Sequence, residues 1–143
     1  MSCLYDLHTH STVSDGSLSP TELVQRAAAG GVRHLALTDH DSVFGLEEAA
    51  QAAVVAGVNL INGVEISVTW NKQSVHIVGL GVSPNHAELQ QGLQKIRDYR
   101  KWRAEEIARR LEKEGIPGAL EGALRYAGGQ LVSRTHFAYF LVE

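Results

Sequence analysis

Two histidines near the N-terminus, His8 and His10, are separated by one residue in the stretch Asp6-Leu7-His8-Thr9-His10-Ser11. In a β-strand, side chains two positions apart point to the same face, so the two imidazoles would lie side by side. Such a pair can bind one metal ion, and Asp15, in the Ser-Asp-Gly turn that follows, can add a carboxylate. Alone, the pair is also typical of ordinary core or surface histidines. It gains weight because ligand-type residues recur after later strands.

The chain next alternates between helical and apolar segments. The sequence Ser-Pro-Thr-Glu at residues 19–22 carries the signature of a capping box, which predicts a helix from Pro20 to about Ala29. Strands separated by short connections and helices predict a parallel α/β sheet or barrel. The other segments of this pattern are an apolar strand at 34–38, an Ala-rich helix at about 46–56 and a strand at 59–64.

The pattern changes after residue 64. Two segments, 65–70 and 74–80, flank Asn71-Lys72-Gln73 and predict a β-hairpin. Helices are expected after it at about 87–114, at about 119–126 and from Arg134, with Ser133 as a cap.

A shift in composition near Asn85 divides the chain into two expected parts. Residues 1–84 hold the metal-type side chains, whereas residues 95–113 contain eight Lys or Arg and four Asp or Glu. We therefore expect a boundary there, with metal-type residues before it and a helical, basic segment after it.

Ligand-type residues follow each expected strand. His8 and His10 end the first strand, His40 ends the second between Asp39 and Asp41, Glu65 ends the third, and His76 lies on the returning hairpin arm. In α/β barrels the carboxyl ends of the strands converge on one face, so these side chains are expected to meet there. Two alternatives stay open: Asp39 orients His8 or His10 without binding metal, and Asp41 caps a helix. Imidazole and carboxylate without thiolate favour Mn, Fe or Zn over Ca or a structural Zn site.

Composition excludes several classes of protein. The formal net charge of −3 argues against a protein that coats nucleic acid, and we expect no stable binding to DNA. No apolar run approaches the roughly 20 residues of a membrane span, so no membrane partner is expected. The single cysteine, Cys3, cannot form an internal disulfide, and we interpret it as a reduced thiol in a cytoplasmic protein.

The long helix expected at 87–114 carries arginines in its apolar stripe. Leu89, Leu93 and Ile96 define the stripe, but the next positions hold Arg100 and Arg103. Either the helix bends there, or two guanidiniums point inward toward a phosphate, which Arg binds bidentately. The alternative is a solvated basic helix with buried stems. The full set of expected substrate-binding residues is Arg100, Trp102, Arg103, Arg134, Thr135 and His136, with Tyr99 or Trp102 stacking on a base.

Four motifs carry a resemblance to a known family. Asp6–Ser11, Thr38–Asp41, Gly63–Ser67 and His76–Gly79 resemble successive motifs of the PHP (polymerase and histidinol phosphatase) superfamily. The segment 133–138 resembles the branch of small bacterial phosphoesterases that includes 3′,5′-nucleoside bisphosphate phosphatase. The resemblance implies an α/β fold, the N-terminal part of a distorted (β/α)7 barrel with a helical insertion. Residues 1–84 would form the metal-binding barrel portion, and residues 85–143 would form the insertion that covers the site.

The resemblance also implies a centre of up to three divalent ions. His8, His10 and Glu65 would hold one ion, Glu65 and His76 a second, and Asp15 and His40 a third; Mn is expected, with Fe, Zn or Mg as alternatives. The family supplies one further ligand to each ion from a C-terminal half that these residues do not contain. We therefore expect the chain to be the N-terminal portion of a longer protein, with its own missing half as a partner.

The expected function is a metal-dependent phosphoesterase. It would release the 3′-phosphate of nucleoside 3′,5′-bisphosphates, giving nucleoside 5′-monophosphates, and would act on short oligoribonucleotides. His40 is the candidate catalytic residue, protonating the leaving oxygen. The rival functions are a histidinol-phosphate phosphatase, a non-catalytic metal-binding PHP module, and a metal hydrolase acting on C–N bonds.

Overall fold

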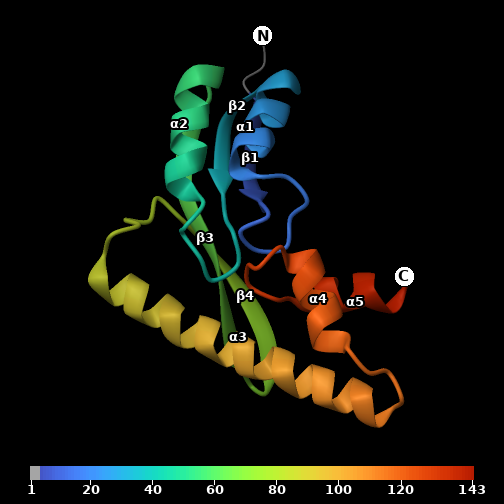
Figure 1. The fold of residues 1–143 in the computed structure, drawn as a ribbon. Coiled ribbons are helices and arrows are strands. Elements are labelled where there is room, and N and C mark those ends of the chain that lie inside the picture. Colours follow the sequence, from blue (N-terminus) through green and yellow to red (C-terminus); the bar gives the residue numbers. More distant parts are fainter. Residues whose placement is uncertain (1–3) are drawn as a thin grey trace.

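The structure is a computed structural model that describes residues 4–143, so Cys3 lies outside the described residues. The first half of the chain alternates between strands and helices and ends in a β-hairpin, and the second half is helical (Figure 1). In chain order they are β1 (Leu4–Thr9), α1 (Pro20–Ala29), β2 (Val32–Leu37), α2 (Leu46–Ala56), β3 (Asn59–Trp70), β4 (Gln73–Leu80), α3 (Ala87–Lys113), α4 (Ala119–Ala127) and α5 (Arg134–Leu141).

The four strands form one sheet in the order β1-β2-β3-β4. The pairs β1–β2 and β2–β3 are parallel, and β3–β4 is antiparallel. Helices α1 and α2 pack together on one face of the sheet, while the long α3 crosses the lower part of the β3–β4 hairpin (Figure 1). The predicted α/β class is confirmed, and the sheet is the curled half of a barrel.

The helices α1 and α2 have the predicted bounds, because the sequence contains a capping box at the start of α1 and a glycine at the end of α2. Ser19 accepts from the backbone of Glu22, whose side chain returns to the backbone N–H of Ser19. At its far end, α2 stops at Gly57, which adopts a left-handed φ of 66° that a glycine tolerates at no steric cost.

The third strand differs from the prediction. The segments expected as a strand at 59–64 and a hairpin arm at 65–70 form the single strand β3. β3 pairs with β2 as far as Asn62 and with β4 from Gly63, so it changes partners without a break. The turn is also shorter than expected: Asn71 and Lys72 have φ values of 49° and 64°, as in a two-residue hairpin loop.

Two apolar clusters stabilise the chain. The first joins the sheet to α1 and α2, with Leu35, Leu37 and Val64 fully buried, and takes Leu93 from α3. The second lies among α3, α4 and α5 around Ala104, Ala123 and Phe137. Because α3 contributes to both clusters, it ties the helical half to the sheet. The predicted division at residues 84/85 stays a prediction.

Between Ala87 and Lys113 the helix α3 is continuous, so the arginines in its stripe are not explained by a break. Arg100 is 5% exposed and points inward, as one of the two sequence-based alternatives proposed. Within residues 4–143, no helix combines the length and the apolar character needed to cross a bilayer.

Gly16 closes the loop that carries Asp15. A Cβ at this position would overlap the carbonyl oxygen of His10 and lie 2.6 Å from its carbonyl carbon. These are backbone atoms, so a side chain can be accommodated only if the loop moves away from His10.

We predict that Gly16→Ala destabilises the protein by about 1–3 kcal/mol, as expected for overpacking. The matched control is Gly92→Ala, at an exposed position of α3 where a Cβ meets nothing within 4 Å. Removing a helical glycine should stabilise by about 0.5–1 kcal/mol. Urea denaturation of the full-length gene product measures both; equal effects would contradict the close approach of Gly16 to His10.

Candidate metal centre

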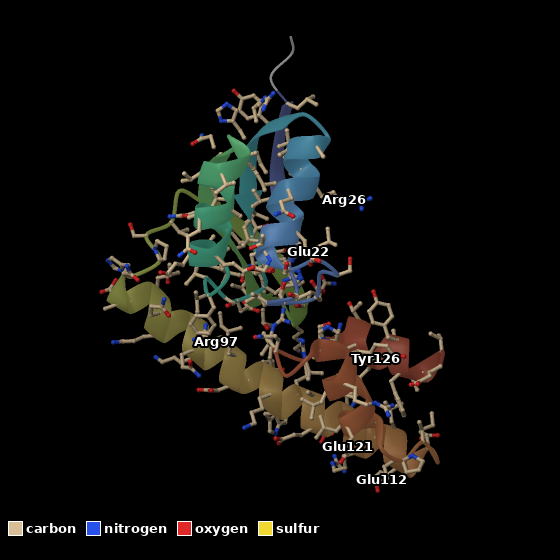
Figure 2. The ribbon with its side chains drawn as sticks, turned by 45° about the horizontal axis from the view of Figure 1, so that its top comes forward. Glu22, Arg26, Arg97, Glu112, Glu121 and Tyr126 are labelled. Carbon is tan, nitrogen blue, oxygen red and sulfur yellow. The ribbon has the colours of Figure 1, made fainter. Side chains whose placement is uncertain are left out.

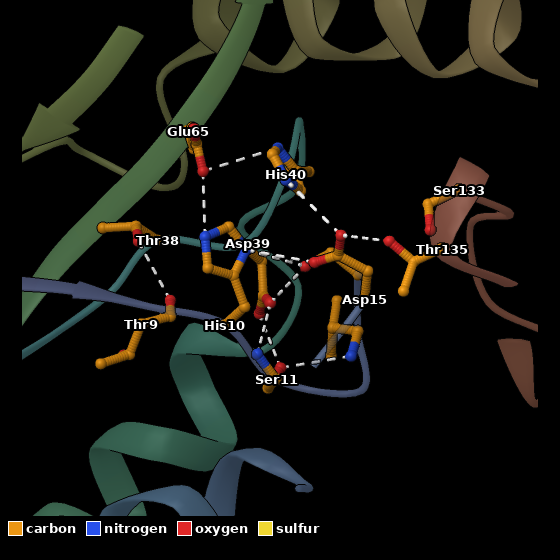
Figure 3. A network of polar contacts seen from close by, with 12 residues as sticks. Thr9, His10, Ser11, Asp15, Thr38, Asp39, His40, Glu65, Ser133 and Thr135 are labelled. Atoms are coloured by element: carbon orange, nitrogen blue, oxygen red, sulfur yellow. Dashed lines mark hydrogen bonds and ion pairs between the residues drawn. The ribbon is translucent and has the colours of Figure 1, made fainter. Parts of the chain in front are cut away.

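The candidate ligands meet around one carboxylate. Oε2 of Glu65 lies 2.9 Å from Nε2 of His8 and 2.9 Å from Nε2 of His10. Its second oxygen, Oε1, lies 3.1 Å from Nδ1 of His76. His40 approaches the same carboxylate, with Nδ1 at 3.6 Å from Oε2 (Figure 3). Four imidazoles therefore surround Glu65: His8 lies on β1, His10 directly after β1, His40 in the segment after β2, and His76 on β4.

Asp15 completes the cluster from the loop after β1. Its Oδ1 lies 3.4 Å from Nδ1 of His10, and its Oδ2 lies 3.7 Å from Nε2 of His40 (Figure 3). Three groups in the cluster have ligand atoms within 4.8 Å of one another, which is close enough to share an ion. The groups are His8–His10–Glu65, His10–Asp15–His40 and His40–Glu65–His76.

The backbone brings His40 to Glu65. The N–H of Asp41 donates to the carbonyl of Glu65 at 2.9 Å, and the N–H of Glu65 donates to the carbonyl of Asp39 at 3.1 Å. These bonds make residues 39–41 a short parallel extension of β2 beside β3. The convergence of strand ends, which the sequence predicts from a barrel, is thus fixed by specific hydrogen bonds.

Asp39 organises the loop between His10 and Asp15. Its carboxylate accepts from the backbone N–H and hydroxyl of Ser11 and from the hydroxyl of Ser14, each at 2.7 Å. It reaches His10 only through Ser14, whose Oγ lies 3.4 Å from Nδ1 of His10. Burial raises the pKa of Asp39, and the bonds from Ser11 and Ser14 oppose that rise. Asp39 is therefore placed to hold the loop.

Asp41 ties the helical half to the strand ends. Its carboxylate accepts from the N–H and hydroxyl of Ser67 at 2.6 and 2.8 Å, and Oδ2 lies 2.6 Å from Nε of Arg100. The interpretation of Asp41 as a helix cap is wrong, because the N-cap of α2 is Gly45. With Arg100 5% exposed and Asp41 fully buried, this is a buried ion pair, and removing one partner would leave an uncompensated charge.

The electrostatics of the cluster suit a divalent cation. Burial lowers the pKa of His40 to about 4 even though the Asp15 carboxylate opposes the shift, so the imidazole is neutral at pH 7. Desolvation works to raise the pKa of Glu65, but the hydrogen bond from His8 and the nearby imidazoles outweigh it, and the net shift is downward.

The same cluster contains a buried ring nitrogen that makes no hydrogen bond. Nδ1 of His40 is buried and has no hydrogen-bond partner among the described residues. A neutral imidazole with a buried free nitrogen beside an ionised carboxylate is the donor set that Mn, Fe or Zn takes, so the residues fit the expected ions.

Four of the expected substrate-binding residues lie at the metal cluster. Arg100, Arg103, Arg134 and Thr135 line a cavity of about 150 Å³ together with Asp15, His40 and His76. Oγ1 of Thr135 lies 3.5 Å from Oδ2 of Asp15 (Figure 3). The arginines of α3 and α5 thus face the candidate ligands.

The other two expected residues lie elsewhere. His136 is buried, and its Nδ1 accepts from the backbone N–H of Ser133 at 3.0 Å, which makes it part of the cap of α5. Trp102 is 56% exposed, packs against Tyr99 with ring centroids 5.5 Å apart, and does not line the cavity. Their roles toward a substrate stay predictions.

The sequence analysis missed Arg97. Arg97 lies on α3 (Figure 2). Its guanidinium donates to the carbonyl of Asp41 at 2.9 Å and lies 4.7 Å from the centroid of the Phe44 ring. A signal exists in the sequence: Arg97, Arg100 and Arg103 recur every three residues and so share one side of α3. Arg97 thereby contacts the same loop, residues 41–44, that follows the ligand His40.

Comparison with known proteins agrees with this geometry. The family model described as "PHP domain" matches residues 6–118, which include every candidate ligand. The chain belongs to the PHP domain family. A 3′,5′-nucleoside bisphosphate phosphatase of Chromobacterium violaceum is 50% identical over 139 residues, covering 96% of this chain and 49% of the relative. A 5′-3′ exoribonuclease of Haemophilus influenzae is 52% identical over 97% of this chain and 50% of its own length.

The PHP chain thus spans about half the length of the curated relatives that it matches. Solved structures show the same relation. An amidohydrolase from Chromobacterium violaceum, solved with bound sulfate and no metal, superposes with a TM-score of 0.92 at 50% identity, over 96% of this chain and 49% of that one. A Bifidobacterium adolescentis protein assigned as a metal-dependent phosphoesterase superposes with a TM-score of 0.89 at 28% identity, over 96% and 49% of the two chains.

We predict that Glu65→Gln lowers the content of bound divalent metal, because this carboxylate contacts all four imidazoles. Elemental analysis of the full-length gene product after loading with Mn measures the effect. Glu121→Gln, in the first turn of α4 and away from the cluster, is the matched control and should keep the wild-type content. Equal metal content in both variants would remove Glu65 from the centre.

Proposed function

We propose that this chain forms the N-terminal, metal-binding part of a phosphoesterase that hydrolyses the 3′-phosphate of nucleoside 3′,5′-bisphosphates and acts on short oligoribonucleotides. The observation that carries the proposal is the position of three ligand groups around Glu65, directly beside the arginines of α3 and α5. Relatives named for these two activities, each about half identical to this chain, support it.

Cleavage of the same type of bond, between phosphorus and the 3′ oxygen, accounts for both activities. Water adds to the phosphorus, and the bond from phosphorus to the 3′ oxygen breaks, with the 3′ oxygen leaving as a hydroxyl. A bisphosphate then yields a nucleoside 5′-monophosphate and inorganic phosphate. An oligoribonucleotide yields the same monophosphate from its 5′ end, and the phosphate stays on the remaining chain. The two substrates differ only in what the 3′-phosphate carries.

The candidate ligands hold the ions needed for this reaction. We propose three ions, held by His8–His10–Glu65, by Glu65–His76 with His40, and by Asp15–His40 with His10, and Mn as the metal. Bound divalent ions would supply activation of water and neutralisation of phosphoryl charge. His8 and His76, whose side chains are 52% and 41% exposed, leave room for further ligands from the other half of a longer chain.

Arg103 and Arg134 are proposed to bind substrate phosphate. Burial lowers the pKa of the Arg103 guanidinium, and the neighbouring charges of Arg100 and Arg134 lower it further. Asp41 already pairs with Arg100, so Arg103 and Arg134 have no carboxylate partner among the described residues. An anion between them would relieve this repulsion, and a phosphate matches the fork of each guanidinium.

His40 has two proposed roles, and they require different protonation states of its imidazole. As a ligand it must be neutral, which its lowered pKa of about 4 favours at pH 7. As an acid toward the leaving oxygen it would need a proton. We therefore place His40 first among the ligands and keep proton donation as a secondary proposal.

Three further proposals concern the whole protein. The division into a barrel portion at 1–84 and an insertion at 85–143 that covers the site is one of them. The second is a cytoplasmic location, and the third is a partner half supplied by a longer chain, in line with relatives about twice as long.

The rival functions make different demands on the site. Histidinol phosphate carries one phosphate and does not need the arginines of the insertion. Hydrolysis of a C–N bond does not need them either. A non-catalytic module would not need ligand groups of this completeness.

The test is phosphate release by the full-length gene product with added Mn from adenosine 3′,5′-bisphosphate and from histidinol phosphate. We expect the bisphosphate to be preferred and His40→Ala to abolish turnover, because His40 belongs to two ligand groups. Release from histidinol phosphate alone would favour the first rival, and release from neither by metal-loaded protein would favour the non-catalytic module.

We predict that Arg103→Ala raises KM for the bisphosphate about ten-fold, since a charged hydrogen bond to phosphate contributes about 1.5 kcal/mol or more. Arg109→Ala is the matched control, because Arg109 is exposed and pairs with Glu106 within α3. Initial-rate kinetics on the two variants decide the matter, and an unchanged KM for Arg103→Ala would exclude it from phosphate binding.

A further inference from the structure

A second hollow continues from the candidate metal centre. It has a volume of about 490 Å³ and lies between the β3–β4 hairpin and α3. Ser74, Arg100, Arg103 and Arg134 line both this hollow and the cavity at the ligands, so the two form one groove. Its volume is within the roughly 300–1,000 Å³ typical of small-molecule sites. We call this hollow the hairpin groove.

The hairpin groove is positively charged in a chain whose formal net charge is −3. Five basic residues line it and no acidic residue does; beyond the three arginines shared with the metal cavity, these are Lys72 and Lys95. Arg100 is paired with Asp41, but the other four make no ion pair within residues 4–143. Unpaired cations along one groove are typical of a surface that follows a phosphate backbone.

An aromatic ring lies along the same groove. Tyr99 lines it, is 54% exposed, and packs against Trp102, with ring centroids 5.5 Å apart at an interplanar angle of 32°. An exposed ring beside a basic track is the usual platform on which a base of single-stranded nucleic acid stacks.

The far end of the groove is open. Lys72 at the hairpin turn, Thr69 before it and Lys95 on α3 line the groove but not the cavity at the ligands, and all three are exposed. A pocket that receives a terminal nucleotide must end, because it accepts one unit. The side of the site that receives the rest of a chain must stay open, because that length varies. The open end therefore suits the part of the substrate that lies 3′ of the bond being cut.

Resting on the proposed function, we propose that the hairpin groove binds the nucleotides 3′ of the scissile phosphate in a single-stranded oligoribonucleotide. Lys72 and Lys95 contact its phosphates, and Tyr99 stacks on a base. A nucleoside bisphosphate ends at the scissile phosphate, so it leaves the part of the groove at Lys72, Lys95 and Tyr99 empty. The groove thus determines how well the enzyme uses an oligoribonucleotide compared with a bisphosphate.

The experiment compares kcat/KM for a short 5′-phosphorylated oligoadenylate with that for adenosine 3′,5′-bisphosphate, using the full-length gene product with Mn. For Lys72→Gln/Lys95→Gln and for Tyr99→Ala, we expect the ratio of the two values to fall about ten-fold. Tyr99→Phe keeps the ring and should restore the ratio. Lys113→Ala, at the exposed end of α3 outside the groove, is the control for lost charge.

Salt dependence separates phosphate contacts from a general effect on structure. The slope of log(kcat/KM) for the oligoadenylate against log salt should become shallower by about 0.7 for each lost contact in the double lysine variant. An unchanged ratio and slope, or an equal loss for both substrates, would overturn the proposal.

Failure of the proposed function gives a different result. Protein that hydrolyses neither substrate would contradict that function, and fluorescence anisotropy of a labelled oligoadenylate would still test the groove. Binding weakened by the groove variants but not by Lys113→Ala supports the proposal, and binding that is absent or unaffected overturns it.

Discussion

The contact of one carboxylate with four imidazoles is the constraint on which the structure depends. Glu65 lies within β3 and can meet His8, His10, His40 and His76 only if β1 and the extension of β2 end beside it and β4 runs back along β3. The parallel order of the first three strands and the antiparallel return of β4 provide this arrangement. The caps of α1 and α2 and the buried residues of the first apolar cluster hold the strands in place. The fold therefore serves mainly to bring ligands from distant positions into one group.

A buried ion pair connects the second half of the chain to this group. Arg100 reaches from α3 to Asp41, directly after the ligand His40, and Arg97 holds the carbonyl of the same residue. Breaking a buried pair on one side costs about 3–5 kcal/mol, so α3 is firmly fixed over the strand ends. This position brings Arg103 to the metal cavity and opens the hairpin groove beside it. The proposed binding of substrate phosphate and of a longer oligoribonucleotide thus depends on one helix that the ion pair orients.

The sequence indicated most of the side chains that meet around Glu65, because the signals were local and chemically specific. His8 and His10 share a strand face, and Gly30-Gly31, Ser19 and Gly57 mark helix ends that can be read directly. It did not predict the unbroken β3, because the change of partner at Gly63 depends on tertiary pairing rather than on periodicity. The hydrogen-bond partners of Asp39 and Asp41 could not be predicted from the sequence either. Both follow the same short apolar strand, and only the tertiary structure shows that Asp39 binds Ser11 whereas Asp41 binds Ser67 and Arg100.

The central claim is that the side chains around Glu65 capture divalent ions, and anomalous diffraction tests it most directly. Crystals of the full-length gene product grown with Mn should show anomalous peaks within the coordination distance of Glu65 and His40. Peaks are expected in each of the three groups around these residues. The three groups comprise six residues, namely His8, His10, Asp15, His40, Glu65 and His76. A map with strong anomalous peaks elsewhere and none among these six residues would contradict the account.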